Sequence, residues 1–299
     1  MEARGKWIHI QGNTWCIELR VMIPVFLCEG GDAILLDSGY AEDRAELLRL
    51  LAEKNLRVRA IIGSHAHRDH CGNHAWFQEN CSAEIVMPRQ EAVFAASYAG
   101  MRAIYAPASA ARLAQLLPGL VFQADKMIAA GENLIEIGGF AFLLYDLPGH
   151  TFGHTGIMTP DHVLYVADAV LDEKTLAHSK LLSIMDWRED AISKERIKDI
   201  CADAYILAHC CITDRIGELI QYNHAVKKKQ AREISRWLHE KGPITLSEAE
   251  RLVWNRLCLH SQKDLSQIVY QRNLRCLLEY LIQTGDLKMN FDGGTEVYM

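Results

Sequence analysis

The chain has 299 residues, of which 49% are hydrophobic and 23% are charged, and it contains 20 Gly and 7 Pro. This composition is typical of a globular protein and excludes a disordered, collagen-like or coiled-coil chain. The net charge is −6 overall, −9 over residues 1–220 and +3 over residues 221–299. The change of sign indicates a boundary between two parts of the chain near residue 220.

Cysteine usage and hydropathy bear on the compartment. The nine cysteines are odd in number and include no CxxC pair, and Cys210 and Cys211 are adjacent. Such a pattern in a long chain favours reduced thiols over a disulfide framework, so we expect a cytoplasmic protein. No apolar run follows the charged residues 1–7, and no window of about 18 residues is apolar throughout. We therefore expect neither export nor a membrane span.

Short apolar runs bounded by Gly, Pro or polar residues predict β-strands through the first two-thirds of the chain. They cover residues 33–36, 58–62, 84–87, 140–145, 163–166 and 205–207. Helical patterns cover 41–53 and 194–201, the second with Ser193 as its N-cap. The Ala-rich residues 89–130 predict one or two inserted helices that either line a pocket or pack on the sheet. Strands alternating with helices predict an α/β fold.

The pattern becomes helical from Gly217 onward. Helices are predicted at 218–239, 246–257 and 265–283, followed by a hairpin of 287–290 and 295–298. The hairpin turn, residues 291–294, contains the Asp and Gly that tolerate positive φ. Three helices and a hairpin are the outline of a winged helix. We therefore divide the chain into an α/β domain, 1–216, and a small helical, winged-helix-like domain, 217–299.

The segment 64–73 holds a dense cluster of metal-ligand residue types. His65, His67, Asp69 and His70 occupy four of six consecutive positions. Imidazole nitrogen and carboxylate oxygen suit Zn²⁺, iron or manganese. A His-x-His spacing can put two rings on one side of the backbone, whereas residues 69 and 70 are adjacent and point differently. Two metals that share the loop are therefore easier to build than one.

Further ligand types follow other predicted strands. Asp37, His150, Asp168 and His209 each lie just past the end of an apolar run, as His65 does after 58–62. Ligands of α/β sheets bind at the carboxyl ends of the strands. We therefore expect these five segments to meet at one metal site.

These motifs resemble those of the metallo-β-lactamase superfamily of hydrolases. The matching segments are Asp37 in LDSG, the HxHxDH loop at 65–70, His150 in PGHTFGH, Asp168 after Ala167, and His209. They occur in the family's order over about residues 8–215. The resemblance implies an αββα sandwich with a dinuclear metal site in a cleft at one sheet edge. PGHTFGH is most similar to the glyoxalase II-like subgroup, and the predicted winged helix to lactamase-β-like proteins that end in one.

The resemblance also implies a set of ligands, three for each of two divalent ions and one that bridges them. The implied ligands are His65, His67 and His150 for one ion, Asp69, His70 and His209 for the other, and Asp168 for both. Asp37 would support the loop from behind the ligands. Zn²⁺ is the expected metal for these residues, with iron or manganese as alternatives.

The chain departs from the family beside two of these ligands. Members usually have Gly before the bridging Asp and on both sides of the last His, where this chain has Ala167, Ala208 and Cys210. Cys210 is either a packed thiol or an additional metal ligand or oxidation-sensitive group. We expect His154, near His150 in the Gly-rich turn, to be a structural hydrogen-bond partner.

The predicted function is metal-dependent hydrolysis by a hydroxide that bridges the two ions. Asp69 is the predicted catalytic residue, because it can also orient this nucleophile. The glyoxalase-like motif favours a thioester or another small acyl ester as the small-molecule substrate. One alternative is a nuclease or phosphodiesterase that holds nucleic acid on the winged helix, disfavoured by the negative charge of residues 1–220. Another is an oxidoreductase that resembles the mononuclear iron persulfide dioxygenases.

The predicted winged helix has core-like spacing in its third helix, which carries Arg272 and Arg275 among leucines. We expect it to pack, to form a homodimer or to cover the cleft rather than to read DNA. The run Lys227-Lys228-Lys229 is interpreted as a solvated helix face, with binding of nucleic acid or another anion as the alternative.

Overall fold

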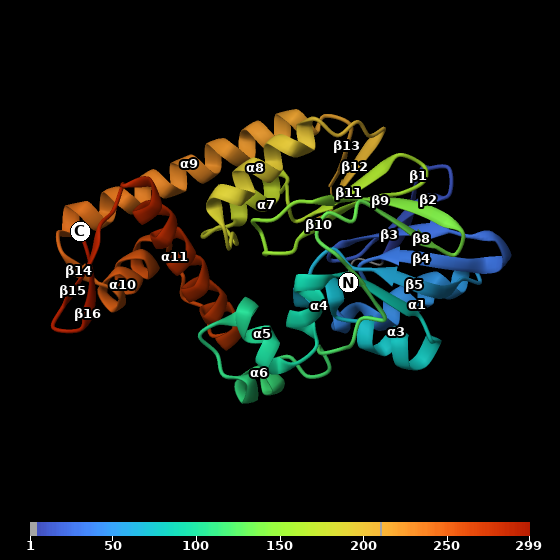
Figure 1. Ribbon diagram of the computed structural model, residues 1–299, viewed down its shortest axis with the longest axis horizontal. Coiled ribbons are helices and arrows are strands. Elements are labelled where there is room, and N and C mark those ends of the chain that lie inside the picture. The colour runs from blue at the N-terminus through green and yellow to red at the C-terminus, as the bar shows by residue number, and fades with distance from the viewer. Residues whose placement is uncertain (1–4, 210) are drawn as a thin grey trace.

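The computed structural model describes residues 5–209 and 211–299. Two β-sheets pack face to face, and helices cover their outer sides (Figure 1). A further group of helices with a small third sheet follows at the C-terminal end. The αββα layers that the sequence predicted are therefore present. Among the described residues, no helix is both long and apolar enough to cross a bilayer.

The first sheet has seven strands in sequential order. They are β1 (Lys6–Gln11), β2 (Thr14–Glu18), β3 (Met22–Leu27), β4 (Asp32–Leu36), β5 (Arg57–Ile62), β6 (Glu84–Pro88) and β7 (Lys126–Ile128). Neighbouring strands are antiparallel from β1 to β4 and parallel from β4 to β7. The parallel strands bring the carboxyl ends of β4 and β5 to the same edge of the sheet.

The second sheet has six strands in the order β13-β12-β11-β10-β9-β8. They are β8 (Leu134–Ile137), β9 (Phe140–Asp146), β10 (Thr155–Met158), β11 (Val163–Ala167), β12 (Ala204–Leu207) and β13 (Cys211–Thr213). Only the β11–β12 pair is parallel among these described strands. Asp168 and His209 therefore follow two adjacent strands that run in the same direction.

Helices occupy the connections and the C-terminal region. They are η1 (Glu29–Gly31), η2 (Ala41–Asp43), α1 (Arg44–Glu53), α2 (Arg68–Cys71), α3 (His74–Cys81), α4 (Arg89–Ala95), α5 (Tyr98–Tyr105), α6 (Ala110–Leu116), α7 (Glu173–His178), α8 (Trp187–Lys198), α9 (Ile216–Lys241), α10 (Leu246–Leu257) and α11 (Asp264–Thr284). The third sheet has the order β14-β16-β15, formed by β14 (Ile244–Thr245), β15 (Met289–Asp292) and β16 (Thr295–Tyr298).

Alternation along the strands builds the layers. In β4, Ile34 and Leu36 pack in the core between the two sheets, whereas Ala33 and Leu35 pack in the core beneath the helices of the first sheet. All four are fully buried, because this strand is covered on both faces. Burial on both faces explains why the strand was visible in the sequence as a continuous apolar run.

The structure confirms all six predicted strands and moves some helix boundaries. The helix predicted from residue 194 begins at Trp187, where the Asp186 side chain accepts from the N–H groups of Arg188 and Glu189. Ser193, the predicted cap, instead donates its hydroxyl to the Pro148 carbonyl at 2.6 Å.

The insertion between β6 and β7 contains three short helices, α4, α5 and α6, rather than one or two. Ser97 and Ser109 begin the second and third of them, because each side chain accepts a backbone N–H of the first turn. Serine caps in the Ala-rich segment explain why it breaks into several pieces.

The C-terminal elements follow the predicted order with one shift in the hairpin. Its turn consists of Gly293 and Gly294 alone, with φ of 55° and 86°, so the strand predicted at 287–290 lies at 289–292. The helices form a core together with Leu182, which lies before α8, and Trp187, the first residue of α8. Ile216 and Ile220, at the start of α9, pack against the second sheet. The division at residue 216 and the winged-helix assignment stay predictions.

Candidate metal centre

Seven residues that the sequence singled out as ligands meet at one edge of the two sheets. Asp37 follows β4, His65 follows β5, Asp168 follows β11 and His209 follows β12. Asp37 and Ala167 have positive φ, 63° and 45°, at these strand ends, a conformation that turns the chain sharply. Ala167, where the family resemblance led us to expect Gly, thus adopts a backbone conformation that glycine favours.

The HxHxDH loop is held against the segment that follows β4. His67 lies at the N-cap of α2, and His70 lies within that helix. The backbone N–H of Ser38 donates to the carbonyl of His70 at 2.7 Å, and that of Gly72 donates to the carbonyl of Gly39 at 3.0 Å. These bonds place the loop beside Asp37.

Three histidines, His65, His67 and His150, form the buried histidine group. Nδ1 of His67 lies 3.0 Å from Nε2 of His65 and 2.8 Å from Nε2 of His150. The three rings thus turn one nitrogen each toward a common point, with Asp168 Oδ2 3.3 Å from Nε2 of His150. Burial lowers the pKa of all three rings, that of His150 to about 4, so they are neutral at pH 7. Neutral imidazole is the form that binds a metal.

Asp69, His70 and His209 form the outer group around the same Asp168. Nε2 of His70 lies 3.5 Å from Asp168 Oδ2 and 3.8 Å from Asp69 Oδ2, and Nε2 of His209 lies 3.3 Å from Asp168 Oδ1. The Asp168 carboxylate raises the pKa of His209 to about 9. Burial lowers the pKa of His70, but the carboxylates of Asp168 and Asp37 outweigh it and raise that pKa above its ordinary value.

Asp37 supports the outer group from behind. Its buried carboxylate accepts from the backbone N–H and the hydroxyl of Ser64, both at 2.6 Å, and from the hydroxyl of Tyr165 at 2.8 Å. Nδ1 of His70 lies 2.7 Å from the same carboxylate, which turns Nε2 of His70 toward Asp168. Asp37 therefore orients the ring, as the resemblance implied.

The donor set fits divalent cations. Each of the two groups, together with Asp168, offers four ligand atoms within 4.8 Å of one another. Nε2 of His70 is buried and has no hydrogen-bond partner among the described residues. In the buried histidine group, three ring nitrogens converge that cannot all carry protons at such distances. Nitrogen and carboxylate oxygen in this number suit Zn²⁺, iron or manganese.

Glu91 is a residue at the site that the sequence analysis missed. It is fully buried on α4, and its carboxylate accepts from the N–H of Ala66 at 2.9 Å and from the N–H of Gly153 at 2.8 Å. It therefore ties the loop between His65 and His67 to the turn that follows His150. A single Glu in an Ala-rich segment carries no sequence signal of this role.

The Gly-rich turn contributes a second contact. Nε2 of His154 lies 3.3 Å from the backbone N–H of Asp168, which donates to it, so this ring is a hydrogen-bond partner of the site as expected. The neighbouring His150 donates from Nδ1 to the Ser183 carbonyl at 2.8 Å, a contact that the sequence did not predict. The two interpretations of Cys210 lie outside the described residues.

The interpretation of residues 227–229 as one solvated face is wrong for Lys227. Lys228 and Lys229 are exposed, but Lys227 is 5% exposed and its Nζ lies 2.8 Å from Asp190. Lys194, equally buried, pairs with the same carboxylate. This charge cluster joins α8 to α9, because two lysines there share one aspartate.

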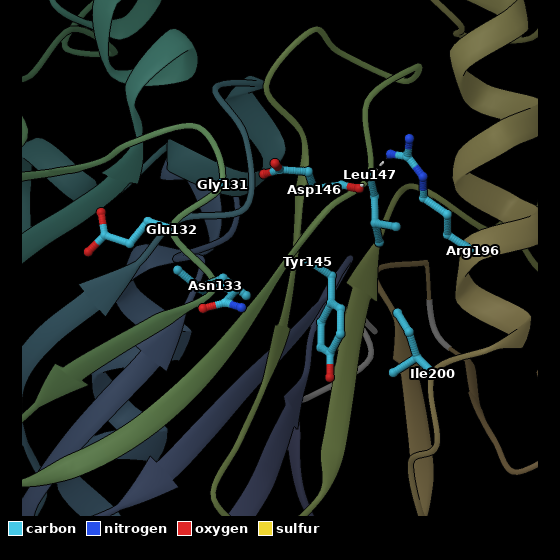
Figure 2. Close-up of a pocket in the computed structure, with 9 residues that line it drawn as sticks. Gly131, Glu132, Asn133, Tyr145, Asp146, Leu147, Arg196 and Ile200 are labelled. Carbon is cyan, nitrogen blue, oxygen red and sulfur yellow. Dashed lines mark hydrogen bonds between the residues drawn. The ribbon is translucent and has the colours of Figure 1, made fainter.

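Two pockets differ in their relation to the metal centre. A small pocket reaches from His150 and Asp168 past Ser183 to the charge cluster. A larger pocket lies at the outer end of β9, where Arg196 reaches from α8 toward Asp146 (Figure 2). None of the residues that line the larger pocket belongs to the buried histidine group or the outer group. The larger pocket is therefore separate from the metal centre, and the metal centre is the candidate functional site.

Comparison with known proteins agrees with this geometry. The family profile described as "Metallo-beta-lactamase superfamily" matches residues 22–209. A hydroxyacylglutathione hydrolase from Serratia proteamaculans is 30% identical over 140 residues, which cover 47% of this chain and 43% of that protein. One from Hyphomonas neptunium is 26% identical over 141 residues, with the same coverage. The chain thus spans less than half the length of these curated relatives.

Solved structures share the fold over more of the chain. A metallo-beta-lactamase family protein from Thermus thermophilus has a TM-score of 0.68 and 21% identity, and the match covers 93% of both chains. A beta-lactamase domain protein from Burkholderia ambifaria has a TM-score of 0.66 and 16% identity, covering 100% of this chain and 94% of that one. Coverage this wide includes the C-terminal helices.

Proposed function

The chain belongs to the metallo-beta-lactamase superfamily of hydrolases, and from this premise we propose that it is a dinuclear metal hydrolase that cleaves a thioester or another small acyl ester. The observation that carries the proposal is the sharing of Asp168 by two ligand groups. Its carboxylate lies 3.3 Å from the ligand nitrogens of His150 and His209 and 3.5 Å from that of His70. A carboxylate between two groups of histidines is suited to bridging two ions.

The proposed ligands divide by their position. The buried histidine group would hold the first ion and the outer group the second, with Asp168 on both. Superfamily members bind divalent metals, and for nitrogen and oxygen ligands of this kind we propose zinc. When bound, the two ions supply a water that is deprotonated near neutral pH and polarise the substrate carbonyl.

Asp69 is the proposed catalytic residue within the outer group. Its side chain is 17% exposed, and its Oδ2 lies 3.8 Å from Nε2 of His70 and 3.5 Å from the hydroxyl of Tyr40. A carboxylate at this half-open position can accept a hydrogen bond from the attacking water and so orient it. The fully buried His65 faces no such opening and is suited to holding a metal alone.

The names of the curated relatives and the negative charge of residues 1–220 support an acyl-ester substrate. Curated relatives are named hydroxyacylglutathione hydrolases, which by that name act on acylated glutathione. The net charge of −9 over residues 1–220 repels a polyanion such as RNA. Burial of Lys227 further reduces the basic surface that nucleic acid would need. A small uncharged or weakly charged acyl group fits these observations better.

Metal content and turnover together test the proposal. Protein purified without added metal is analysed for metals per chain, and a panel of thioester, lactone and phosphodiester substrates is assayed on the same sample. About two zinc ions per chain with acyl-ester turnover is the expected result. One iron per chain without hydrolysis would overturn it in favour of oxygen chemistry, and turnover confined to phosphodiesters would overturn the substrate class.

A further inference from the structure

Arg272 brings a buried charge from the C-terminal region to the metal centre. It lies on α11, is 5% exposed, and has no carboxylate among the hydrogen-bond partners that the described residues provide. Figure 1 shows α11 extending between α5 and the C-terminal elements. The guanidinium thus sits between two parts of the chain far apart in sequence.

Neutral acceptors surround this guanidinium. Nη1 donates to the carbonyl of Ile104 at 2.9 Å, Nη2 donates to Ser183 Oγ at 2.7 Å, and Nε and Nη2 donate to Asn273 Oδ1 at 3.0 and 2.7 Å. Arg has five N–H donors in a planar fork and stays protonated when buried. It can therefore join the end of α5, the loop before α8 and α11 itself with a single side chain.

The same fork lies beside one ring of the buried histidine group and supports a second ring through Ser183. Nη1 lies 3.3 Å from Nε2 of His67, on the side of the ring opposite Nδ1, which faces His65 and His150. With Nδ1 of His67 free to bind a metal, its Nε2 carries the ring proton, and Arg272 has no acceptor for that proton, so this contact is packing and not a hydrogen bond. Arg272 supports His150 indirectly. It donates to the hydroxyl of Ser183, and the carbonyl of Ser183 accepts the Nδ1–H of His150 at 2.8 Å. The path through Ser183 is therefore the one that orients a ring.

The outer group has different support. Asp37 positions His70 together with Ser64 and Tyr165, and all of these residues precede α9. Among the described residues, Arg272 makes no hydrogen bond to His70. Loss of Arg272 should therefore disturb one ligand group and spare the other.

We propose that Arg272 is a positioning residue for the buried histidine group, so that α11 completes one of the two metal sites. This inference rests on the proposed dinuclear function. The C-terminal region thereby becomes part of the metal centre itself, in addition to any role in packing or assembly.

Cobalt titration of metal-free protein tests the inference. Bound Co²⁺ is followed by its absorption and by metal analysis after desalting, for the wild type, Arg272→Met and the matched control Arg275→Met, an exposed position on the same helix. We expect two tightly bound ions in the wild type and in Arg275→Met, and about one in Arg272→Met. Displaced supporting residues typically weaken metal binding about 10- to 100-fold.

Three further variants separate positioning from charge and from folding. Arg272→Lys keeps the charge but has one nitrogen, so we expect it to lose the ion as Arg272→Met does. Ser183→Ala removes the hydroxyl acceptor and keeps the carbonyl, and we expect about tenfold weaker binding of one ion. In a His65→Ala background, which already lacks one ligand of the buried histidine group and should have lost its ion, Arg272→Met should cause no additional loss.

The outcomes distinguish this inference from the proposed function. Wild-type protein that binds two ions, together with Arg272→Met that binds two with unchanged affinity, overturns the inference alone. Recovery of wild-type binding by Arg272→Lys also overturns it. Wild-type protein that binds no metal overturns the proposed function, and the inference with it. Circular dichroism monitors folding, and if Arg272→Met is unfolded, unchanged binding of both ions by Ser183→Ala overturns the inference.

Discussion

The buried histidine group and the outer group share Asp168 but differ in exposure and support. All three members of the buried histidine group are buried, whereas Asp69 and His209 in the outer group are partly exposed, with 17% and 27% of their side chains accessible. Solvent therefore reaches the centre from the outer side. A substrate would approach past Asp69 and His209, while the buried histidine group forms the closed wall behind them.

The supports of the two groups follow the same division. The outer group depends on Asp37 and on residues of the two sheets. The buried histidine group is supported by Glu91 from the inserted helices, by Ser183 from the loop before α8 and, through Ser183, by Arg272 from α11. The more enclosed group is held by elements that the chain adds around the sandwich, so its geometry is the more sensitive to distant changes.

Replacement of Asp168, which the two groups share, should impair metal binding by both groups. Asp168→Ala is expected to release metal from both groups and to reduce acyl-ester turnover by more than about 100-fold, because loss of a mere supporting residue already costs 10- to 100-fold. Metal analysis and steady-state kinetics measure the two effects. Asp199→Ala, at an exposed position, is the control. Two bound ions and a normal rate in Asp168→Ala would disprove the bridging role.

The charge cluster behind the buried histidine group should affect folding more than metal binding at the outer group. Asp190→Asn leaves Lys194 and Lys227 buried without a counter-charge, and breaking such a pair costs about 3–5 kcal/mol. Urea unfolding at pH 7 measures the loss, with the exposed Asp199→Asn as control. An unfolding free energy within 1 kcal/mol of the wild type would contradict the assignment of this cluster as the joint between α8 and α9.

Acid should act on the same cluster. Burial raises the pKa of Asp190, but Lys194 and Lys227 outweigh it and hold that pKa below its ordinary value. The stabilisation is then fully present above the unfolded pKa of about 3.9 and is lost as the pH falls through the lower folded value. Stability of the wild type should therefore decline in this acidic range, and that part of the decline should be missing in Asp190→Asn.

Removal of the Asp37 charge behind His70 should weaken metal binding by the outer group and leave binding by the buried histidine group unchanged. Asp37→Asn places an amide where four donors now meet a carboxylate, so we expect one ion to bind about 10- to 100-fold more weakly and the other to bind normally. Metal titration measures both steps. Tyr165→Phe, which removes one of these donors, should give a smaller loss. Equal weakening of both ions would show that the two groups are not supported separately.

Glu91 offers the corresponding test on the enclosed side, with the smallest expected effect. Glu91→Gln puts an NH₂ opposite the N–H of either Ala66 or Gly153, and a buried donor without an acceptor costs about 1–3 kcal/mol. Thermal unfolding measures the loss, and metal titration should show weaker binding of the ion that the outer group does not hold. The exposed Glu84→Gln is the control. Identical stability of both variants would contradict the bracing role of Glu91.

The ligand residues were visible in sequence because their signal is local. The loop at 65–70 concentrates four of them within six residues, and Asp168, His209 and the supporting Asp37 each follow a short apolar strand. Strand runs that are buried on both faces are continuous and easy to recognise, and the carboxyl ends of strands are where α/β folds place their ligands. The position of these residues at the ends of predicted strands was therefore enough to predict that the segments converge.

The supporting residues have no such signal. Glu91, Ser183 and Arg272 lie in an Ala-rich segment, a loop and a leucine-rich helix, and each resembles an ordinary surface or helical residue there. Lys227 in a run of three lysines was misread for the same reason, since burial of one face of α9 depends on α8 packing against it. The start of α8 was misplaced because Ser193, the predicted cap, bonds the Pro148 carbonyl instead, and the number of helices in the 89–130 insertion was too low because serine caps within it divide it into three.

Sequence by itself determined an α/β fold and the candidate metal ligands, because short-range periodicity and spacing encode both, and the family resemblance of the motifs implied the αββα layers. Only the tertiary structure decided which ring nitrogens face one another, which group is enclosed, and that α11 brings Arg272 to His67. Those features depend on packing between segments up to 205 residues apart. Many weak contacts between distant segments contribute to the free energy of that packing, so it cannot be predicted from a local sequence pattern.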